Sequence, residues 1–132
     1  EMADRDTIVF LATLADNADD FKILENALVP ILKSLPGPAR ATTTSLSWSV
    51  VPQVGISIRE AYFADTETVA ATDAIGRISA DLIAPYPPGV AVVAPGEVLT
   101  EQIINGLAAT QKAGVRIAYA SDSTLATYRV IK

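Results

Sequence analysis

The chain has 132 residues, half of them hydrophobic, and carries 10 Lys and Arg against 15 Asp and Glu, which gives a net charge of -5. This length suits one compact domain or slightly more. The acidic balance gives no electrostatic footprint for nucleic acid or for an anionic membrane surface. There is no cysteine and no histidine, which excludes disulfides, thiolate metal sites, cysteine nucleophiles and the Ser-His-Asp arrangement, and no metal site is expected.

The N-terminal part predicts a strand followed by a helix. Thr7–Leu14 is an uncharged apolar run with β-branched residues, which is typical of a buried strand. Asn17 or Asp16 can cap an amphipathic helix over Asn17–Ser34, in which apolar residues recur at helical spacing. Pro30 should kink this helix or end its regular part. The run Pro36-Gly37-Pro38 stops the helix and marks a linker.

The remainder predicts a small sheet, one further main helix and several short helices. Ser57 and Thr72 are expected N-caps of two short helices. Thr100 caps the longer helix, and Gly114 suits the position just after its end. Strands are expected at Ile78–Ala84, Val90–Ala94, Val115–Ala118 and Tyr128–Ile131, with irregular or edge-strand structure over Ala41–Ser57. The predicted fold class is mixed α/β (α+β), in two parts, residues 1–38 and 39–132.

Few side chains in the sequence are candidates for a catalytic role. The amines are Lys22, Lys33, Lys112 and Lys132. Each falls on a solvated helix face, in a last helical turn or at the chain end. A surface role is therefore favoured over a Schiff base, which needs a desolvated amine with a lowered pKa. No catalytic, cofactor-binding or metal-ligating residue is expected in this chain.

Five short motifs stand in one order between residues 59 and 97: Arg59-Glu60-Ala61-Tyr62-Phe63, Glu67-Thr68-Val69, Gly76-Arg77-Ile78-Ser79-Ala80, Tyr86-Pro87-Pro88-Gly89-Val90 and Pro95-Gly96-Glu97. In this order and spacing they resemble the C-terminal domain of the Orn/Lys/Arg decarboxylases, large bacterial pyridoxal-phosphate (PLP) enzymes. Val115–Lys132 resembles the last strands of that family. Thr7–Ser34 resembles the strand and helix that precede the domain, in the smaller domain of the aminotransferase-like fold. Ala91 departs from the proline that often follows the fourth motif.

The resemblance implies the C-terminal fragment of a cytoplasmic, aminotransferase-like lyase of polyamine biosynthesis. Arginine, converted to agmatine and CO2, is favoured as substrate over lysine and ornithine. In the family a lysine in a Ser-x-His-Lys context holds PLP, and this chain has no such motif. It is therefore expected to be inactive alone, with the missing catalytic domain, a second subunit and the basic amino acid as partners, and neither nucleic acid nor membrane. The alternative is a free-standing, non-catalytic module that binds a decarboxylase or a small cationic regulator.

The family's C-terminal domain lies near the active-site entrance, so the resemblance implies channel residues here. Glu67, beside Asp65 in a loop-like stretch, is the first candidate for the cationic end of the substrate. The other interpretation makes it a solvated loop acid or a helix cap. Glu60 is a second candidate, or else a favourable charge at a helix N-terminus.

Two further channel candidates come from the proline-rich motifs. Tyr86 forms a channel wall or a rigid structural turn. Glu97 pairs with Arg77, as a channel feature or as architecture. The single tryptophan, Trp48, is expected to pack in a core or an interface rather than stack on substrate.

Overall fold

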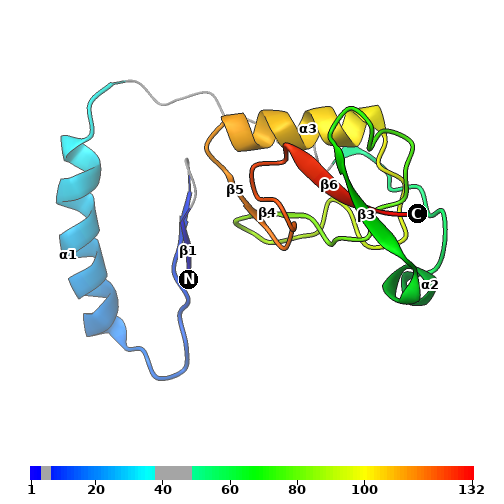
Figure 1. The fold of residues 1–132 in the computed structure, drawn as a ribbon. Coiled ribbons are helices and arrows are strands. Elements are labelled where there is room, and N and C mark those ends of the chain that lie inside the picture. Colours follow the sequence, from blue (N-terminus) through cyan, green and yellow to red (C-terminus); the bar gives the residue numbers. More distant parts are fainter. Residues whose placement is uncertain (4–6, 38–48) are drawn as a thin grey trace. The chain divides into compact units, whose positions relative to one another are not determined.

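The structure is a computed structural model that describes residues 1–3, 7–37 and 49–132. It divides into two compact units, Glu1–Thr42 and Thr43–Lys132. Helices and small two-stranded sheets occur together among the described residues (Figure 1), so the predicted mixed α/β class is confirmed. None of the described helices is long and apolar enough to cross a membrane.

The first unit holds a short hairpin and one helix. Strand β1 (Met2–Ala3) pairs antiparallel with β2 (Ile8–Val9). Helix α1 (Ala18–Ser34) begins after Asn17, as predicted. The Asn17 side chain accepts the Asp19 N–H, and the Asp20 carboxylate accepts the Asn17 N–H, so the capping box satisfies two backbone donors. The helix continues through Pro30 to Ser34, and the proline therefore does not end it.

The prediction of a buried strand over Thr7–Leu14 is wrong. Only Ile8–Val9 is a strand, and α1 contains no buried residue. The exposed large apolar side chains of this unit include Ile8, Phe10, Leu11, Leu14, Phe21, Ile23 and Leu32. A two-residue pairing and one helix supply too little surface to cover such a run, because burial needs a second packed layer.

The second unit contains α2 (Ile58–Phe63), β3 (Thr66–Ala70), β4 (Ala84–Tyr86), α3 (Glu101–Lys112), β5 (Arg116–Ala118) and β6 (Thr127–Ile131). Strand β3 pairs with β6 and β4 with β5, both antiparallel. Helix α3 runs beside both ladders (Figure 1) and buries its apolar stripe against them. The largest fully buried core side chains include Ile83, Val93, Leu99, Ile103, Leu107 and Val130.

The helices of this unit begin and end where the sequence predicted. Ser57 and Glu60 form a capping box at α2. Thr100 accepts the Ile103 N–H at α3. Gly114 follows the last turn of α3 with a φ of 90°, a conformation that favours glycine. These N-caps and this C-terminal glycine are confirmed.

Three expectations in the second unit are wrong. The segment after Thr72 is a series of turns rather than a helix. Ile78–Ala84 and Val90–Ala94 are not strands over these ranges, because only Ala84 belongs to a strand, β4, and the other β-pairing in them consists of isolated bridges. Strand β3 was not predicted at all. Trp48 lies outside the described residues, as does residue range 41–48 of the segment expected to be irregular.

Candidate functional site

Glu67 lies on a strand, where the sequence predicted a loop-like stretch. In β3 its backbone is opposite Val130 of β6. Its Oε1 accepts a hydrogen bond from Nη2 of Arg77 at 2.6 Å, and the same nitrogen donates to the Ile131 carbonyl at 2.8 Å. Both side chains are partly exposed. A carboxylate can accept about four hydrogen bonds, so Glu67 keeps capacity for a second cationic group.

Glu60 and Glu97 each close a local turn of backbone. The Glu60 carboxylate accepts the Ser57 N–H at 2.8 Å, and the Ser57 side chain and backbone bonds hold the pKa of Glu60 below its usual value. Glu97 accepts the Ala94 N–H at 2.8 Å. The predicted pair between Glu97 and Arg77 is wrong, because the Arg77 guanidinium lies against Glu67 instead.

Tyr86 ends β4 at the start of the proline turn. It is half exposed and stands opposite Arg116 of β5 in the ladder. The turn closes with a bond from the Gly89 N–H to the Pro85 carbonyl at 3.0 Å, and the two X-Pro bonds within it are cis. Among the described residues, no hydrogen bond or ion pair joins two of the four channel candidates.

The sequence did not predict an ion pair between the buried carboxylate of Asp81 and the half-exposed guanidinium of Arg129. The Asp81 side chain is only 7% exposed, and its Oδ1 accepts from Nε of Arg129 at 2.8 Å. Its Oδ2 accepts the Ser121 N–H at 2.8 Å, and Nη2 of Arg129 donates to the Ala80 carbonyl at 3.2 Å. The available signal was a lone carboxylate within the apolar run Ile78–Pro85.

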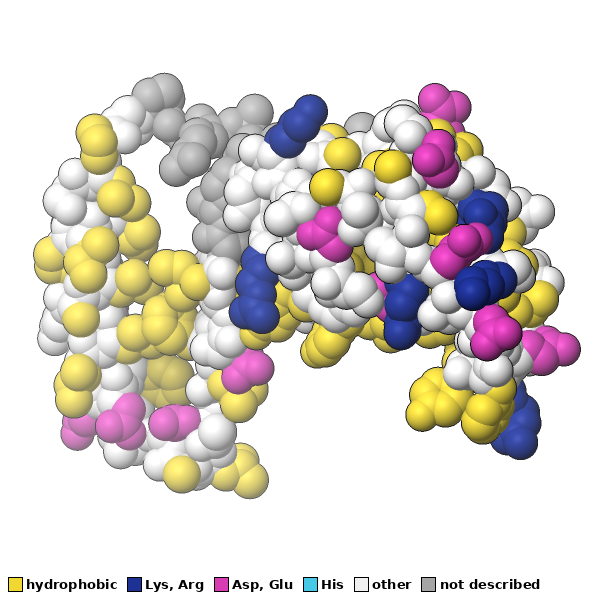
Figure 2. All heavy atoms as spheres, in the orientation of Figure 1, with side chains coloured by type: hydrophobic (Ala, Val, Ile, Leu, Met, Phe, Trp, Pro, Cys, Tyr) yellow, Lys and Arg dark blue, Asp and Glu magenta, His cyan; other side chains and the backbone are white. Residues whose placement is uncertain are grey.

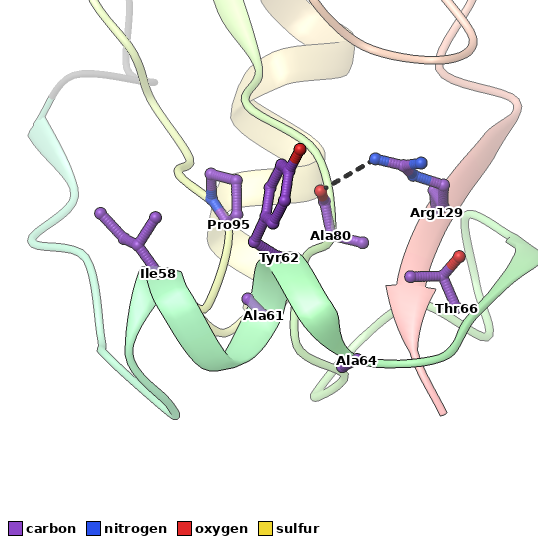
Figure 3. A pocket seen from close by; sticks show the side chains of 8 residues that line it. All are labelled: Ile58, Ala61, Tyr62, Ala64, Thr66, Ala80, Pro95 and Arg129. Carbon is purple, nitrogen blue, oxygen red and sulfur yellow. Dashed lines mark hydrogen bonds between the residues drawn. The ribbon is translucent and has the colours of Figure 1, made fainter.

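A pocket of about 230 Å³ lies beside this pair. It is lined by Ile58, Ala61, Tyr62, Ala64, Thr66, Ala80, Pro95 and Arg129. Figure 3 shows the Tyr62 ring rising from α2 beside Ala80, with the Arg129 guanidinium directed toward Ala80 from β6. The pocket therefore combines small apolar side chains with three polar groups, the Arg129 guanidinium, the Tyr62 phenol and the Thr66 hydroxyl.

The residues present do not provide a site for PLP, which requires a desolvated lysine amine. All four lysines are exposed, whereas an amine that forms a Schiff base must be desolvated. The pocket contains no lysine. Within the described ranges, no three Asp or Glu side chains come together as a metal site. No step of a cofactor reaction can be assigned to these residues.

The turn before β6 depends on one carboxylate. Asp122 accepts bonds from the hydroxyl and N–H of Thr124 and from the N–H and hydroxyl of Thr127. These bonds, those of Thr124 foremost, lower the pKa of Asp122 from 3.8 to about 2. The carboxylate is thus ionised in the folded turn over nearly the whole accessible pH range.

Asp122→Ala is expected to destabilise the chain at pH 7 and much less at pH 2. A carboxyl with a lowered pKa in the folded state stabilises fully above its unfolded pKa of 3.8, and this contribution is lost as pH falls toward 2. Urea unfolding of both proteins between pH 2 and pH 7 measures the difference. A gap between the two curves that does not shrink on acidification would contradict this expectation.

Tyr128 carries a buried hydroxyl without a partner among the described residues. Burial, with a smaller contribution from the Asp122 charge, raises the pKa of Tyr128 to about 12. An unsatisfied buried donor costs about 1–3 kcal/mol. Tyr128→Phe is therefore expected to leave the free energy of unfolding unchanged or to raise it by about 1 kcal/mol. Urea unfolding tests this, and a clear loss of stability would reveal a partner for the hydroxyl.

Comparison with known proteins identifies the second unit. The family model described as Orn/Lys/Arg decarboxylase, C-terminal domain, matches residues 43–117. The chain is 32% identical to arginine decarboxylase of Bacillus subtilis over 100% of its own length and 27% of that protein. It is 54% identical to the inducible lysine decarboxylase of Escherichia coli over 37 residues, 28% of the chain and 5% of that protein.

A solved structure agrees with these matches. The constitutive lysine decarboxylase of Escherichia coli superposes with a TM-score of 0.51 and 27% identity, over 66% of this chain and 14% of that one. The fold is thus that of a decarboxylase C-terminal domain. The chain belongs to the Orn/Lys/Arg decarboxylase family, and it spans about a quarter of the arginine decarboxylase that it matches over its full length.

Proposed function

We propose that the chain is the C-terminal part of a cytoplasmic, PLP-dependent decarboxylase that converts arginine to agmatine and CO2. The observation that carries the proposal is the 32% identity to an arginine decarboxylase along the whole chain, of which the chain is only 27%. Bound PLP supplies the electron sink for loss of CO2, and the remaining polypeptide would have to hold it. A free-standing binding module is not favoured, because the relatives that match the whole chain are decarboxylases.

Within this proposal, Glu67 meets the cationic end of the substrate. It already holds the guanidinium of Arg77 at 2.6 Å, so its position suits the group that distinguishes arginine. Arg77 also bonds the Ile131 carbonyl, which fixes the guanidinium and orients the carboxylate. Glu60 and Glu97 are held by backbone N–H groups and serve mainly to shape their turns. Tyr86 would supply part of the channel wall.

The test compares this chain with the protein encoded by its complete reading frame. Both are incubated with PLP and, separately, with arginine, lysine or ornithine, and CO2 release is measured. The 132-residue chain alone is expected to release none, and the longer protein is expected to prefer arginine. Activity of the chain alone, or an upstream sequence without a decarboxylase domain, would refute the proposal.

Glu67→Gln in the longer enzyme is expected to raise KM for arginine about tenfold and to leave kcat nearly unchanged. Loss of a charge-assisted bond made equally in the ground and transition states weakens binding without slowing the chemistry. Glu101→Gln, in the first turn of α3, is the matched control because Glu101 is an exposed carboxylate outside the candidate set. An unchanged KM for Glu67→Gln would remove this residue from the channel.

A further inference from the structure

Helix α2 presents large apolar side chains to solvent. Of its six residues only Ala61 is buried, while Ile58, Tyr62 and Phe63 are 65%, 79% and 72% exposed. Figure 2 shows these apolar side chains gathered over α2 at the lower right. Fully burying such side chains contributes about 1.5–3 kcal/mol each. A partner that covered this surface would therefore gain a large favourable free energy of binding.

This surface is also held in a fixed arrangement. The rings of Tyr62 and Phe63 meet edge to face with centroids 5.1 Å apart. The Arg59 guanidinium lies 5.4 Å from the centre of the Phe63 ring. Aromatic side chains and arginine are the residues enriched in protein interfaces. Because their mutual contacts restrict them, they would lose less conformational entropy on binding.

The size of the pocket beside α2 limits what enters it. At about 230 Å³ it lies below the roughly 300–1,000 Å³ of small-molecule sites. Its walls include three alanines and one proline, namely Ala61, Ala64, Ala80 and Pro95, whose small side chains leave the space open (Figure 3). A volume of this kind accommodates one apolar side chain rather than a cofactor.

The guanidinium of Arg129 at the pocket edge favours a negatively charged group on whatever binds there. A guanidinium has five N–H donors, and Arg129 uses one on Asp81 and one on the Ala80 carbonyl. The remaining donors have no partner among the described residues, and the side chain is 45% exposed. Because Asp81 holds it in place, the guanidinium is oriented for a further carboxylate.

We propose that this pocket is the anchor at which the rest of the decarboxylase polypeptide docks on the domain. The docking segment inserts one apolar side chain between Tyr62 and Pro95 and places a neighbouring carboxylate on Arg129. This inference rests on the proposed function, since the occupant belongs to the part of the polypeptide beyond this chain. The relative lengths support that source, because the matched arginine decarboxylase is covered over only 27%.

Cysteine labelling tests the proposal, because the chain has no cysteine of its own. Tyr62→Cys is introduced into the 132-residue chain and into the complete protein, and modification by iodoacetamide is followed on the peptide that contains residue 62. Labelling is expected to be about tenfold slower in the complete protein, where the reagent reaches the thiol only when the interface opens. Ser123→Cys, at an exposed turn, is the control and should label equally in both.

A second variant separates the pocket from the surface around it. Ala64→Trp fills the pocket, and Ile58→Cys then serves as reporter at its other end. In the complete protein this combination should label at the rate seen in the isolated chain. If Ile58→Cys stays protected with the pocket filled, docking does not use the pocket and the proposal is overturned.

The labelling experiment also distinguishes other occupants of the pocket. Protection that appears in the isolated chain as its concentration rises would mean that a second copy fills the pocket, which overturns the proposal. Arginine decarboxylation by the complete protein without any substitution reports separately on the proposed function, because Tyr62→Cys alters the proposed docking surface. Activity with an unprotected thiol overturns only the docking site, whereas protection without activity supports docking and refutes the proposed reaction.

Discussion

Gly96→Ala is expected to lower the free energy of unfolding by about 3 kcal/mol, combining a left-handed backbone with an overpacked contact. Gly96 has a φ of 95°, and a Cβ there would lie 2.5 Å from the Ile56 carbonyl oxygen. The backbone cannot move aside easily. The Gly96 carbonyl accepts the N–H groups of Gly55 and Ile56, and its own N–H donates to the Ser79 carbonyl.

Gly76→Ala is the matched control for this substitution. Gly76 has a similar φ of 80°, but nothing lies within 4 Å of the Cβ that alanine would add. It should cost only the conformational penalty of about 1–2 kcal/mol. Urea unfolding followed by far-ultraviolet circular dichroism measures both proteins. Equal losses in the two variants would show that the contact with Ile56 relaxes freely.

The Gly96 turn also illustrates what the sequence predicts well. Helix caps and turns depend on a few neighbouring residues, so Asn17, Ser57, Thr100 and Gly114 marked their helix ends without any knowledge of the rest. Pro95 and Gly96 likewise form a turn, which residues of these two types favour. The close approach of Gly96 to Ile56 was beyond prediction, because it depends on how two distant segments meet.

The predictions of strands and of ion pairs failed for the same physical reason, namely that both depend on segments far apart in the sequence. Strand β3 has few apolar residues, and it is a strand because β6, some sixty residues later, supplies its hydrogen bonds. Strand β6 also bonds the segment that carries Arg77, through the Ile131 N–H and the Ile78 carbonyl, and so Arg77 meets Glu67 rather than the predicted Glu97. The prediction of a buried strand over Thr7–Leu14 failed for the opposite reason, since here the local pattern favoured a buried strand that the fold does not form. Its composition favours burial, but burial also requires a covering layer, which the described residues of this unit do not supply.

Asp81 shows how such a distant pairing can be tested. Arg129→Met is expected to lower the free energy of unfolding by about 2 kcal/mol, below the roughly 3–5 kcal/mol of a fully buried pair because Arg129 is half exposed. The methionine keeps the aliphatic volume but leaves the buried carboxylate without its cation. Urea unfolding at pH 7 measures the loss. Arg116→Met is the control, since Arg116 is exposed on β5 and forms no ion pair with a described residue.

A double-mutant cycle isolates the pair itself. Asp81→Asn removes the buried charge, so Arg129→Met should cost less in that background than in the wild type. The expected coupling is about 1–2 kcal/mol, because the orphaned carboxylate dominates the single-variant loss. Arg129→Met should still cost some stability in the Asp81→Asn background, since the methionine loses the bond to the Ala80 carbonyl. Additive losses would mean that Arg129 acts through packing and its bond to the Ala80 carbonyl without help from the Asp81 charge, and its fixation by Asp81 beside the pocket would then lose its support.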